Sequence, residues 1–176
     1  MFELVREDIK RFISPDNPSY RKLIAGILSP GFEALIVYRF FNWCHRHRIP
    51  AQPFRYFIER IVEITTGISI PACCKIGKGL RIHHFGGIIL HPAVEIGDNC
   101  TLYHEVTIGD IGGHGGAARI GNNVLVGAGA KIIGEVEIGD DCAIGANAVV
   151  TKNMPPDFLA YGNPAFYRSK HESGES

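Results

Sequence analysis

Residues 120–150 read Ile120-Gly-Asn-Asn-Val-Leu-Val126-Gly-Ala-Gly-Ala-Lys-Ile132-Ile-Gly-Glu-Val-Glu-Ile138-Gly-Asp-Asp-Cys-Ala-Ile144-Gly-Ala-Asn-Ala-Val-Val150, and one pattern returns every six residues. Each repeat opens with an aliphatic residue, glycine often follows, and a small or β-branched residue stands four positions after the aliphatic one. A fixed internal period of this kind is typical of a solenoid. The same spacing continues towards the N-terminus, with aliphatic residues at Ile70, Ile76, Ile82, Leu90, Ile96, Leu102 and Ile108.

Six residues are too few for a helix pair or a propeller blade, but they fit one flat side of a triangular coil. Three repeats then make one turn, with the aliphatic residues inside and neighbouring turns stacked as parallel strands about 4.8 Å apart. The sequence therefore predicts a mainly β protein with a parallel β-helix over residues 69–156. The period breaks twice, through two extra residues near Ile88-Ile89 and through the glycine-rich segment 110–119, which we expect to project as a loop.

The two ends of the chain follow other patterns. Residues 1–68 are predicted to form an N-terminal helical segment, because Ser29-Pro30 is a helix start signal and apolar residues recur at helical spacing after it. Residues 157–176 are predicted to be a C-terminal tail, in which Phe158–Tyr161 folds back over the last coil and the polar end is disordered.

Composition excludes several classes of function. Of the 176 residues, 18 are Lys or Arg and 18 are Asp or Glu, so the balanced charge does not suggest a nucleic-acid partner. No apolar stretch is long enough for a transmembrane segment and the N-terminus lacks a signal peptide, so we expect a cytoplasmic protein. The five cysteines lack zinc-ligand spacing, which argues against a metal. Three of them occupy the small-residue position of a repeat and are predicted to be packing residues: Cys74, Cys100 and Cys142.

Several motifs resemble the hexapeptide-repeat acyltransferases with a left-handed β-helix, and within them the serine O-acetyltransferases. The motifs are Pro30-Gly-Phe-Glu-Ala-Leu-Ile, Lys75-Ile-Gly-Lys-Gly-Leu, Leu102-Tyr-His-Glu-Val-Thr-Ile-Gly, Ile144-Gly-Ala-Asn-Ala and Tyr161-Gly-Asn-Pro-Ala. This resemblance implies a left-handed β-helix, acetyl-CoA as the donor, and a homotrimer with active sites between subunits. The chain is short at its N-terminus, which resembles trimeric rather than hexameric members.

The family's catalytic histidine falls on His84, which the resemblance makes the general base for the acceptor hydroxyl. A neutral imidazole with a pKa near 6.5 suits that task. The coil register also predicts that His84 lies beside His104, and His83 beside Tyr103, with a lowered pKa for at least one of the histidines. We expect the acceptor to be bound by Ser69, His83, His104 and Asp16.

The expected acceptor follows from two aspartates that the family has and this chain lacks. The family's aspartates fall on Ser69 and His83, and an ammonium group without a counter-charge is unfavourable in a partly desolvated pocket. We therefore expect transfer to a hydroxyl of a sugar or polysaccharide precursor. Three alternatives remain: a serine O-acetyltransferase of cysteine biosynthesis, a non-catalytic β-helix scaffold, and N-acetylation of an amino sugar.

The donor is expected to lie along the later coils. Small side chains there allow close approach of the pantetheine arm of acetyl-CoA, and a lysine further on is placed to pair with a phosphate. The predicted donor-binding residues are Gly127, Ala128, Gly129, Ala146 and Lys152.

Overall fold

The structure is a computed structural model that describes residues 1–12, 20–112 and 116–171. In these ranges the chain begins with helices α1 (Phe2–Phe12), α2 (Tyr20–Ile27), α3 (Pro30–Arg46) and α4 (Phe54–Thr66). Short strands follow: β1 (Ile68–Ser69), β2 (Lys75–Ile76), β3 (Arg81–Ile82), β4 (Ile88–Leu90), β5 (Glu95–Ile96), β6 (Thr101–Leu102), β7 (Thr107–Gly109), β8 (Arg119–Ile120), β9 (Leu125–Val126), β10 (Lys131–Ile133), β11 (Glu137–Ile138), β12 (Ala143–Ile144), β13 (Val149–Val150), β14 (Phe158–Tyr161) and β15 (Phe166–Ser169).

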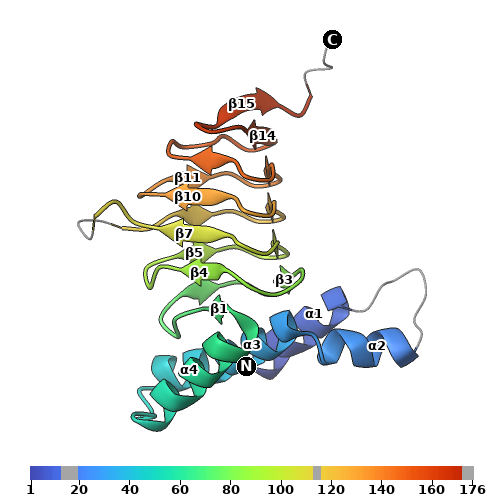
Figure 1. Ribbon diagram of the computed structural model, residues 1–176, viewed down its shortest axis with the longest axis vertical. Helices are drawn as coiled ribbons and strands as arrows, with labels where there is room; N and C mark the ends of the chain where they lie inside the picture. Colours follow the sequence, from blue (N-terminus) through green and yellow to red (C-terminus); the bar gives the residue numbers. More distant parts are fainter. Residues whose placement is uncertain (13–19, 113–115, 172–176) are drawn as a thin grey trace.

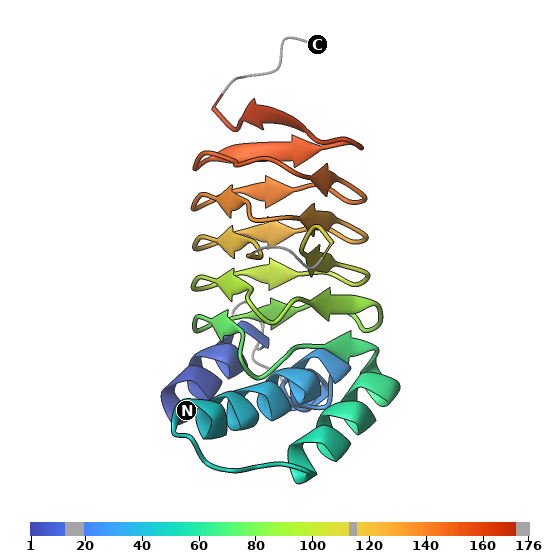
Figure 2. The same ribbon diagram turned by 90° about the vertical axis from the view of Figure 1, so that its left-hand side faces the viewer.

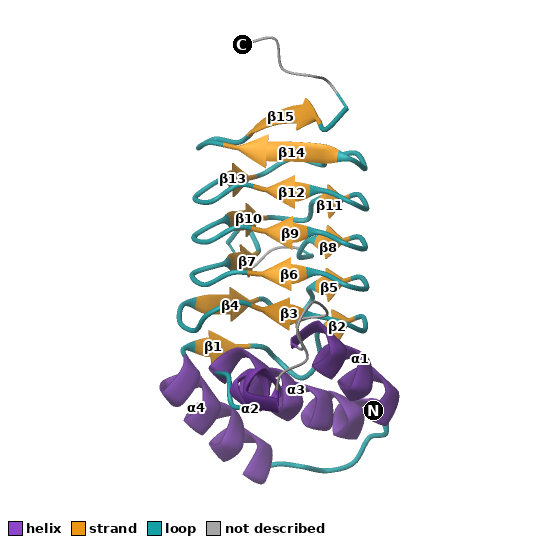
Figure 3. Ribbon diagram, turned by 90° about the vertical axis from the view of Figure 1, so that its right-hand side faces the viewer, coloured by secondary structure: helices purple, strands orange, loops and turns teal. Residues whose placement is uncertain are grey.

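The strands form the three walls of a parallel β-helix. Sheet A has the order β1-β4-β7-β10-β13, sheet B the order β2-β5-β8-β11, and sheet C the order β3-β6-β9-β12-β14-β15. Up to β13, every third strand along the chain therefore joins the same wall, one coil further up the stack (Figures 1 and 3). The predicted β-helix with an N-terminal helical segment is confirmed.

The interior is built by the residues that recur every six positions. On sheet C, Ile82, Leu102, Val126 and Ile144 lie above one another in register, and all four are buried. Burying each such side chain contributes about 1.5–3 kcal/mol. Backbone hydrogen bonds join the coils, for example from the N–H of His83 to the carbonyl of Leu102 at 2.8 Å. The period therefore fixes which residues face inward and which coil each one joins.

The helices lie beneath the first coil, at the opposite end from β15 (Figure 2). Helix α3 begins at Ser29, whose hydroxyl accepts a hydrogen bond from the N–H of Phe32 at 3.3 Å. Its Ala34, Leu35 and Tyr38 join the same hydrophobic core as the coils, so α3 covers the open end of the solenoid. Among the described helices, none combines the length and the apolar character that crossing a membrane requires.

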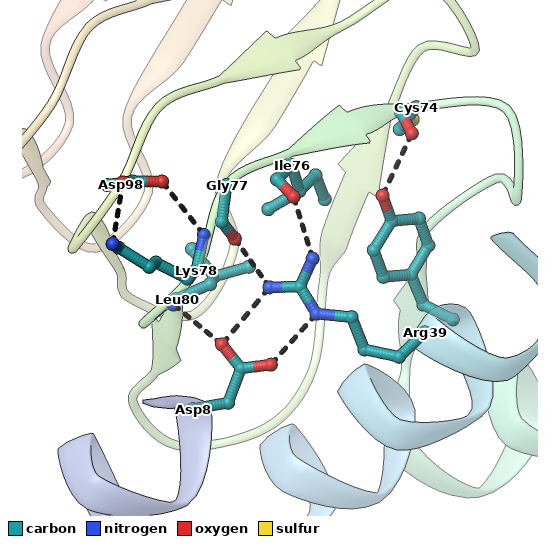
Figure 4. Close-up of polar contacts among 9 residues, drawn as sticks. Asp8, Arg39, Cys74, Ile76, Gly77, Lys78, Leu80 and Asp98 are labelled. Atoms are coloured by element: carbon teal, nitrogen blue, oxygen red, sulfur yellow. Dashed lines mark hydrogen bonds and ion pairs between the residues drawn. The ribbon is translucent and has the colours of Figure 1, made fainter. Parts of the chain in front are cut away.

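A buried ion pair fastens the helices to the first coil (Figure 4). The Arg39 side chain donates to both carboxylate oxygens of Asp8, from Nε at 2.8 Å and from Nη2 at 3.1 Å. Its guanidinium also donates to the carbonyls of Ile76 at 2.7 Å and Gly77 at 2.5 Å. Asp8 in turn accepts the N–H of Leu80 at 3.1 Å. Five hydrogen bonds thus join α1, α3 and the first coil, and the six-residue period does not predict this pairing.

The C-terminal end differs from the predicted tail over residues 157–176. Strand β14 continues sheet C in parallel with β12, and β15 pairs with β14 in the antiparallel direction. Phe158–Tyr161 and Phe166–Ser169 are therefore strands of sheet C, because the inward pattern continues: Ala160 is fully buried, and Tyr167 packs against the core.

The projecting segment is shorter than predicted. Strand β7 ends at Gly109, and β8 begins at Arg119. Arg119 itself belongs to β8, and Ala117 and Ala118 are already buried in the core. The predicted boundary at 119 is therefore wrong, because the two alanines restore the inward-facing pattern before the loop was expected to end.

We expect Asp8→Ala to destabilise the protein by about 3–5 kcal/mol, because it leaves the buried guanidinium of Arg39 without its counter-charge. Urea unfolding followed by circular dichroism measures this loss. The matched control is Glu7→Ala on the same helix, since the Glu7–Lys10 pair is exposed and should contribute less than about 1 kcal/mol. Equal losses for the two variants would contradict the role given to the buried pair.

Candidate active site

The candidate site lies at the corner where sheet C passes into sheet A. The chain there runs from Ile82 to Leu90, two residues more than the six-residue spacing. His84 is exposed in this corner and has a left-handed backbone conformation, with φ of 64°. The extra residues widen the turn, so the side chain of His84 stands on the outside of the coil. We call residues 83–87 and 103–105 the histidine corner.

Ring contacts across two coils confirm the predicted neighbours. The rings of His83 and Tyr103 are stacked, with centroids 4.8 Å apart and planes 10° apart. The rings of His84 and His104 meet edge to face at 5.6 Å and 83°. In the described part of the chain, Nδ1 of His104 is buried and has no hydrogen-bond partner. The two coils therefore bring three imidazoles and one phenol to a single corner.

The sheet C side of the corner carries positive charge. The pKa of His83 lies below its ordinary value, chiefly because of burial and then because of the nearby charges of Arg81 and His84. Burial and the neighbouring Arg11 also lower the pKa of Arg81. Arg11 reaches this wall from α1 and donates to Thr101 Oγ1 at 3.1 Å. The wall therefore favours the neutral form of His83 and a negatively charged group beside it.

One of the predicted acceptor-binding residues, Ser69, is not brought to this corner. Ser69 lies in β1, paired with Ile89, and lines a cleft between α4 and the first coil together with Pro71 and Glu63. No hydrogen bond joins Ser69 to His84 within the residues that the structure describes. Asp16 lies outside the described residues. His83 and His104, by contrast, both stand beside His84.

Two of the predicted donor-binding residues, Ala128 and Ala146, form a column above the histidines. The N–H of Gly129 donates to the carbonyl of His104, and the N–H of Asn147 donates to the carbonyl of Ala128. The column therefore continues from His84 and His104 to Ala128, which is half-buried, and to Ala146, which is exposed. Alanine side chains leave room for a long, narrow ligand to run along the corner.

The other three predicted donor-binding residues are two glycines that pack against the next coil and a lysine that lies away from the corner. A Cβ on Gly127 would lie 2.7 Å from the backbone nitrogen of Ala146, and one on Gly129 would lie 2.1 Å from Asn147 Oδ1. Both glycines are thus required by the close approach of the next coil, whatever they bind. Lys152 follows β13 and stands at the far end of sheet A, away from the histidine corner.

The thiols have a packing role, as the period predicts. Burial raises the pKa of Cys74 to about 12 and that of Cys100 to about 11, and it also raises the pKa of Cys142. Such thiols are protonated at neutral pH and are poor nucleophiles. Over residues 1–12, 20–112 and 116–171, no group of three or more His, Cys, Asp or Glu side chains is arranged to hold a metal ion.

Sequence reasoning missed Arg11, Arg81 and Glu105. Arg81 stands two residues before His83 on the outward face of β3, so strand alternation alone was sufficient to place it. Glu105 follows His104 directly in the corner. Arg11 had no such signal, because its contact with Thr101 depends on how α1 packs against the coils.

Known proteins resemble this chain over most of its length. The family described as Bacterial transferase hexapeptide (six repeats) matches residues 117–152. The chain is 39% identical over 163 residues to a serine acetyltransferase of Helicobacter pylori, covering 89% of this chain and 92% of that protein. The fold is similar to Brucella abortus serine acetyltransferase in complex with coenzyme A, with a TM-score of 0.85, 27% identity, and coverage of 96% and 67%. Soybean serine acetyltransferase complexed with serine gives a TM-score of 0.84 at 28% identity, with coverage of 94% and 68%.

We expect the pKa of His83 to lie below 6.5 in the folded protein, so that its ring stays neutral at pH values where an unperturbed histidine takes up a proton. Histidine ring signals followed by NMR through a pH titration measure it, and the His83→Asn variant identifies the signal. Arg81→Met should raise the midpoint by removing a positive neighbour, while burial keeps it below 6.5. A midpoint at or above 6.5 in the unchanged protein would contradict this account.

Proposed function

The chain belongs to the serine acetyltransferase family, and from that membership we propose that it transfers the acetyl group of acetyl-CoA to the hydroxyl of serine, with His84 as the general base. The observation that carries the proposal is the column at the histidine corner. It places the imidazole of His84 at the lower end of a line of small side chains through Ala128 and Ala146, which fits a narrow pantetheine arm leading to the base.

The related structures support the choice of donor and acceptor. One of them holds coenzyme A and another holds serine. Acetyl-CoA supplies the acetyl group as a thioester when it is bound. The sugar or polysaccharide acceptor that we expected from the sequence has no support among these relatives, and the alternative of serine fits them better. The alternative of a non-catalytic scaffold is also disfavoured. The relatives are named as enzymes, and His84 stands at the position of the family's catalytic histidine.

The proposed mechanism is a direct transfer. His84 accepts the proton of the serine hydroxyl as its oxygen attacks the thioester carbonyl. Collapse of the tetrahedral centre breaks the C–S bond, and the imidazolium returns the proton to the departing sulfur. The products are O-acetylserine and the free thiol of coenzyme A. General-base catalysis of this kind contributes about 10²–10⁴-fold to the rate. His104 lies at the edge of the same ring and helps to orient it.

A second copy of the chain completes the proposed site. His84 is exposed, so on a single chain its corner opens to solvent and does not shield the reaction from water. A homotrimer, as the family resemblance implies, places the wall of a neighbouring subunit against this corner. Phe85 is 65% exposed and Ile89 is 55% exposed beside His84, and both are apolar enough to pack in such an interface.

We expect release of free thiol from acetyl-CoA when serine is the acceptor, and little release with a nucleotide sugar or with glucosamine. A thiol-reactive dye follows all three reactions, and mass spectrometry identifies O-acetylserine. Rapid turnover of the nucleotide sugar, with none of serine, would contradict the proposed acceptor.

His84→Ala should lower kcat with serine by about 10²–10⁴-fold, because it removes the imidazole that accepts the hydroxyl proton. The matched control is His47→Ala, which removes an exposed histidine at the end of α3 and should leave kcat unchanged. Size-exclusion chromatography should give the same assembly for both variants and the unchanged chain. An active His84→Ala variant would refute the assignment of the base.

A further inference from the structure

The turns of the β-helix accept only certain residues in left-handed backbone positions. One column of these positions runs up the corner between sheets C and A, and strand register places its members above one another. Their φ angles are 68° for Gly87, 59° for Glu105, 72° for Gly129 and 56° for Asn147. Glycine and asparagine adopt this conformation readily, but glutamate does not. Glu105 therefore stands where backbone preference alone favours glycine or asparagine.

The same preference holds at the other corners of the coils. The non-glycine residues with positive φ there are Asn99, Asn123, Asp141 and Asp157. Within the described coils, the residues that depart from glycine, asparagine and aspartate are His84 and Glu105, and both lie at the histidine corner. Departures from local backbone preference tend to gather at functional sites. His84 is the proposed base, and the same argument makes Glu105 a candidate for a functional role.

The side chain of Glu105 leans over the coil that carries His84. A Cβ built on Gly87 would lie 2.9 Å from Cγ of Glu105, so the stem of the glutamate occupies the space that a larger residue at 87 would fill. The N–H of Glu105 donates to the carbonyl of Gly86 at 2.9 Å. Glu105 also follows His104, whose ring meets that of His84. The stem of the Glu105 side chain thus packs at the histidine corner, and the residue is exposed there.

This carboxylate is not used in an ion pair within the described part of the chain. Two glutamates on the outer face of sheet B are paired, Glu95 with Lys75 at 2.6 Å and Glu137 with Arg119 at 3.6 Å. Lys131 is the nearest cation to Glu105 by its contacts, but its ammonium donates to the backbone carbonyl of Glu105. The negative charge is therefore available for a ligand.

We propose that Glu105 binds the ammonium group of the acceptor and so determines the specificity of this site for an amino acid. The inference rests on the proposed function, and it supplies the counter-charge that Ser69 and His83 do not provide. A carboxylate that accepts hydrogen bonds from an ammonium group forms one of the stronger polar contacts in proteins. Arg81, whose charge acts on His83 on the sheet C side of the corner, has the sign that suits the carboxylate of the same zwitterion.

The test compares Glu105→Gln with the unchanged enzyme on two probes. Serine carries the ammonium group, whereas 3-hydroxypropionate has the same hydroxymethyl and carboxylate groups without it. We expect the KM for serine to rise about 10-fold or more, with a smaller change in kcat, because a hydrogen bond to a charged group is lost. The inhibition constant of 3-hydroxypropionate against serine should stay within about twofold, and it can be measured whether or not this probe is acetylated.

Two further variants separate recognition from folding. Glu137→Gln removes a carboxylate from the outer face of sheet B and should leave both constants unchanged. Glu105→Gly removes the carboxylate and relieves the left-handed backbone, so it should weaken serine binding as Glu105→Gln does while the melting temperature stays the same or rises. If Glu105 had only a structural role, its variants would have a lower melting temperature, and the constants for serine and for 3-hydroxypropionate would change equally.

The outcomes distinguish the two proposals. If the unchanged enzyme acetylates serine and Glu105→Gln keeps the same KM for serine, the role of Glu105 is overturned and serine acetylation stands. If the unchanged enzyme does not acetylate serine at all, the proposed function is overturned, and the ammonium-binding role of Glu105 is overturned with it.

Discussion

The structure depends on one constraint: an aliphatic side chain must point inward every six residues while the backbone of each coil bonds to the next. Leu102, Val126 and Ile144 have no exposed surface, and their register is held by backbone hydrogen bonds such as that from Tyr103 to Val126 at 3.0 Å. A slip by one residue would turn the buried side chains outward, so the register is strongly fixed. The register therefore places each corner residue above the equivalent residue of the coil below it, so that the corner residues form columns.

Corner residues of successive coils lie above one another in columns, and this brings side chains that are far apart in the sequence into one site. At the corner between sheets C and A the inward pattern does not determine the exposed side chains, and His84 and Glu105 stand there although the left-handed backbone favours glycine and asparagine. His84, His104, Ala128 and Ala146 follow one another up this corner, which places a base below a line of small residues. The proposed charges are complementary to a zwitterion, with Arg81 on the sheet C side and Glu105 above the base.

The sequence predicted what the period controls and missed what tertiary packing controls. The six-residue period predicts the walls, the packed thiols and the contact between His84 and His104. It does not predict the Asp8–Arg39 pair, because that pair joins α1 to α3. The strands after residue 157 were missed because their inward position is held by the small Ala160, where the earlier repeats have a larger aliphatic residue. The expected sugar acceptor rested on the absence of carboxylates at Ser69 and His83, and it left Glu105 out of account.

The central claim is that the coil register brings the donor to His84 along the column of small residues. A crystal structure of the protein with coenzyme A tests it most directly. We predict that the pantetheine arm lies along Ala146 and Ala128 and that its sulfur ends beside the imidazole of His84, with a second subunit closing the other side. Coenzyme A bound on the outer face of sheet B, or with its sulfur far from His84, would contradict the account.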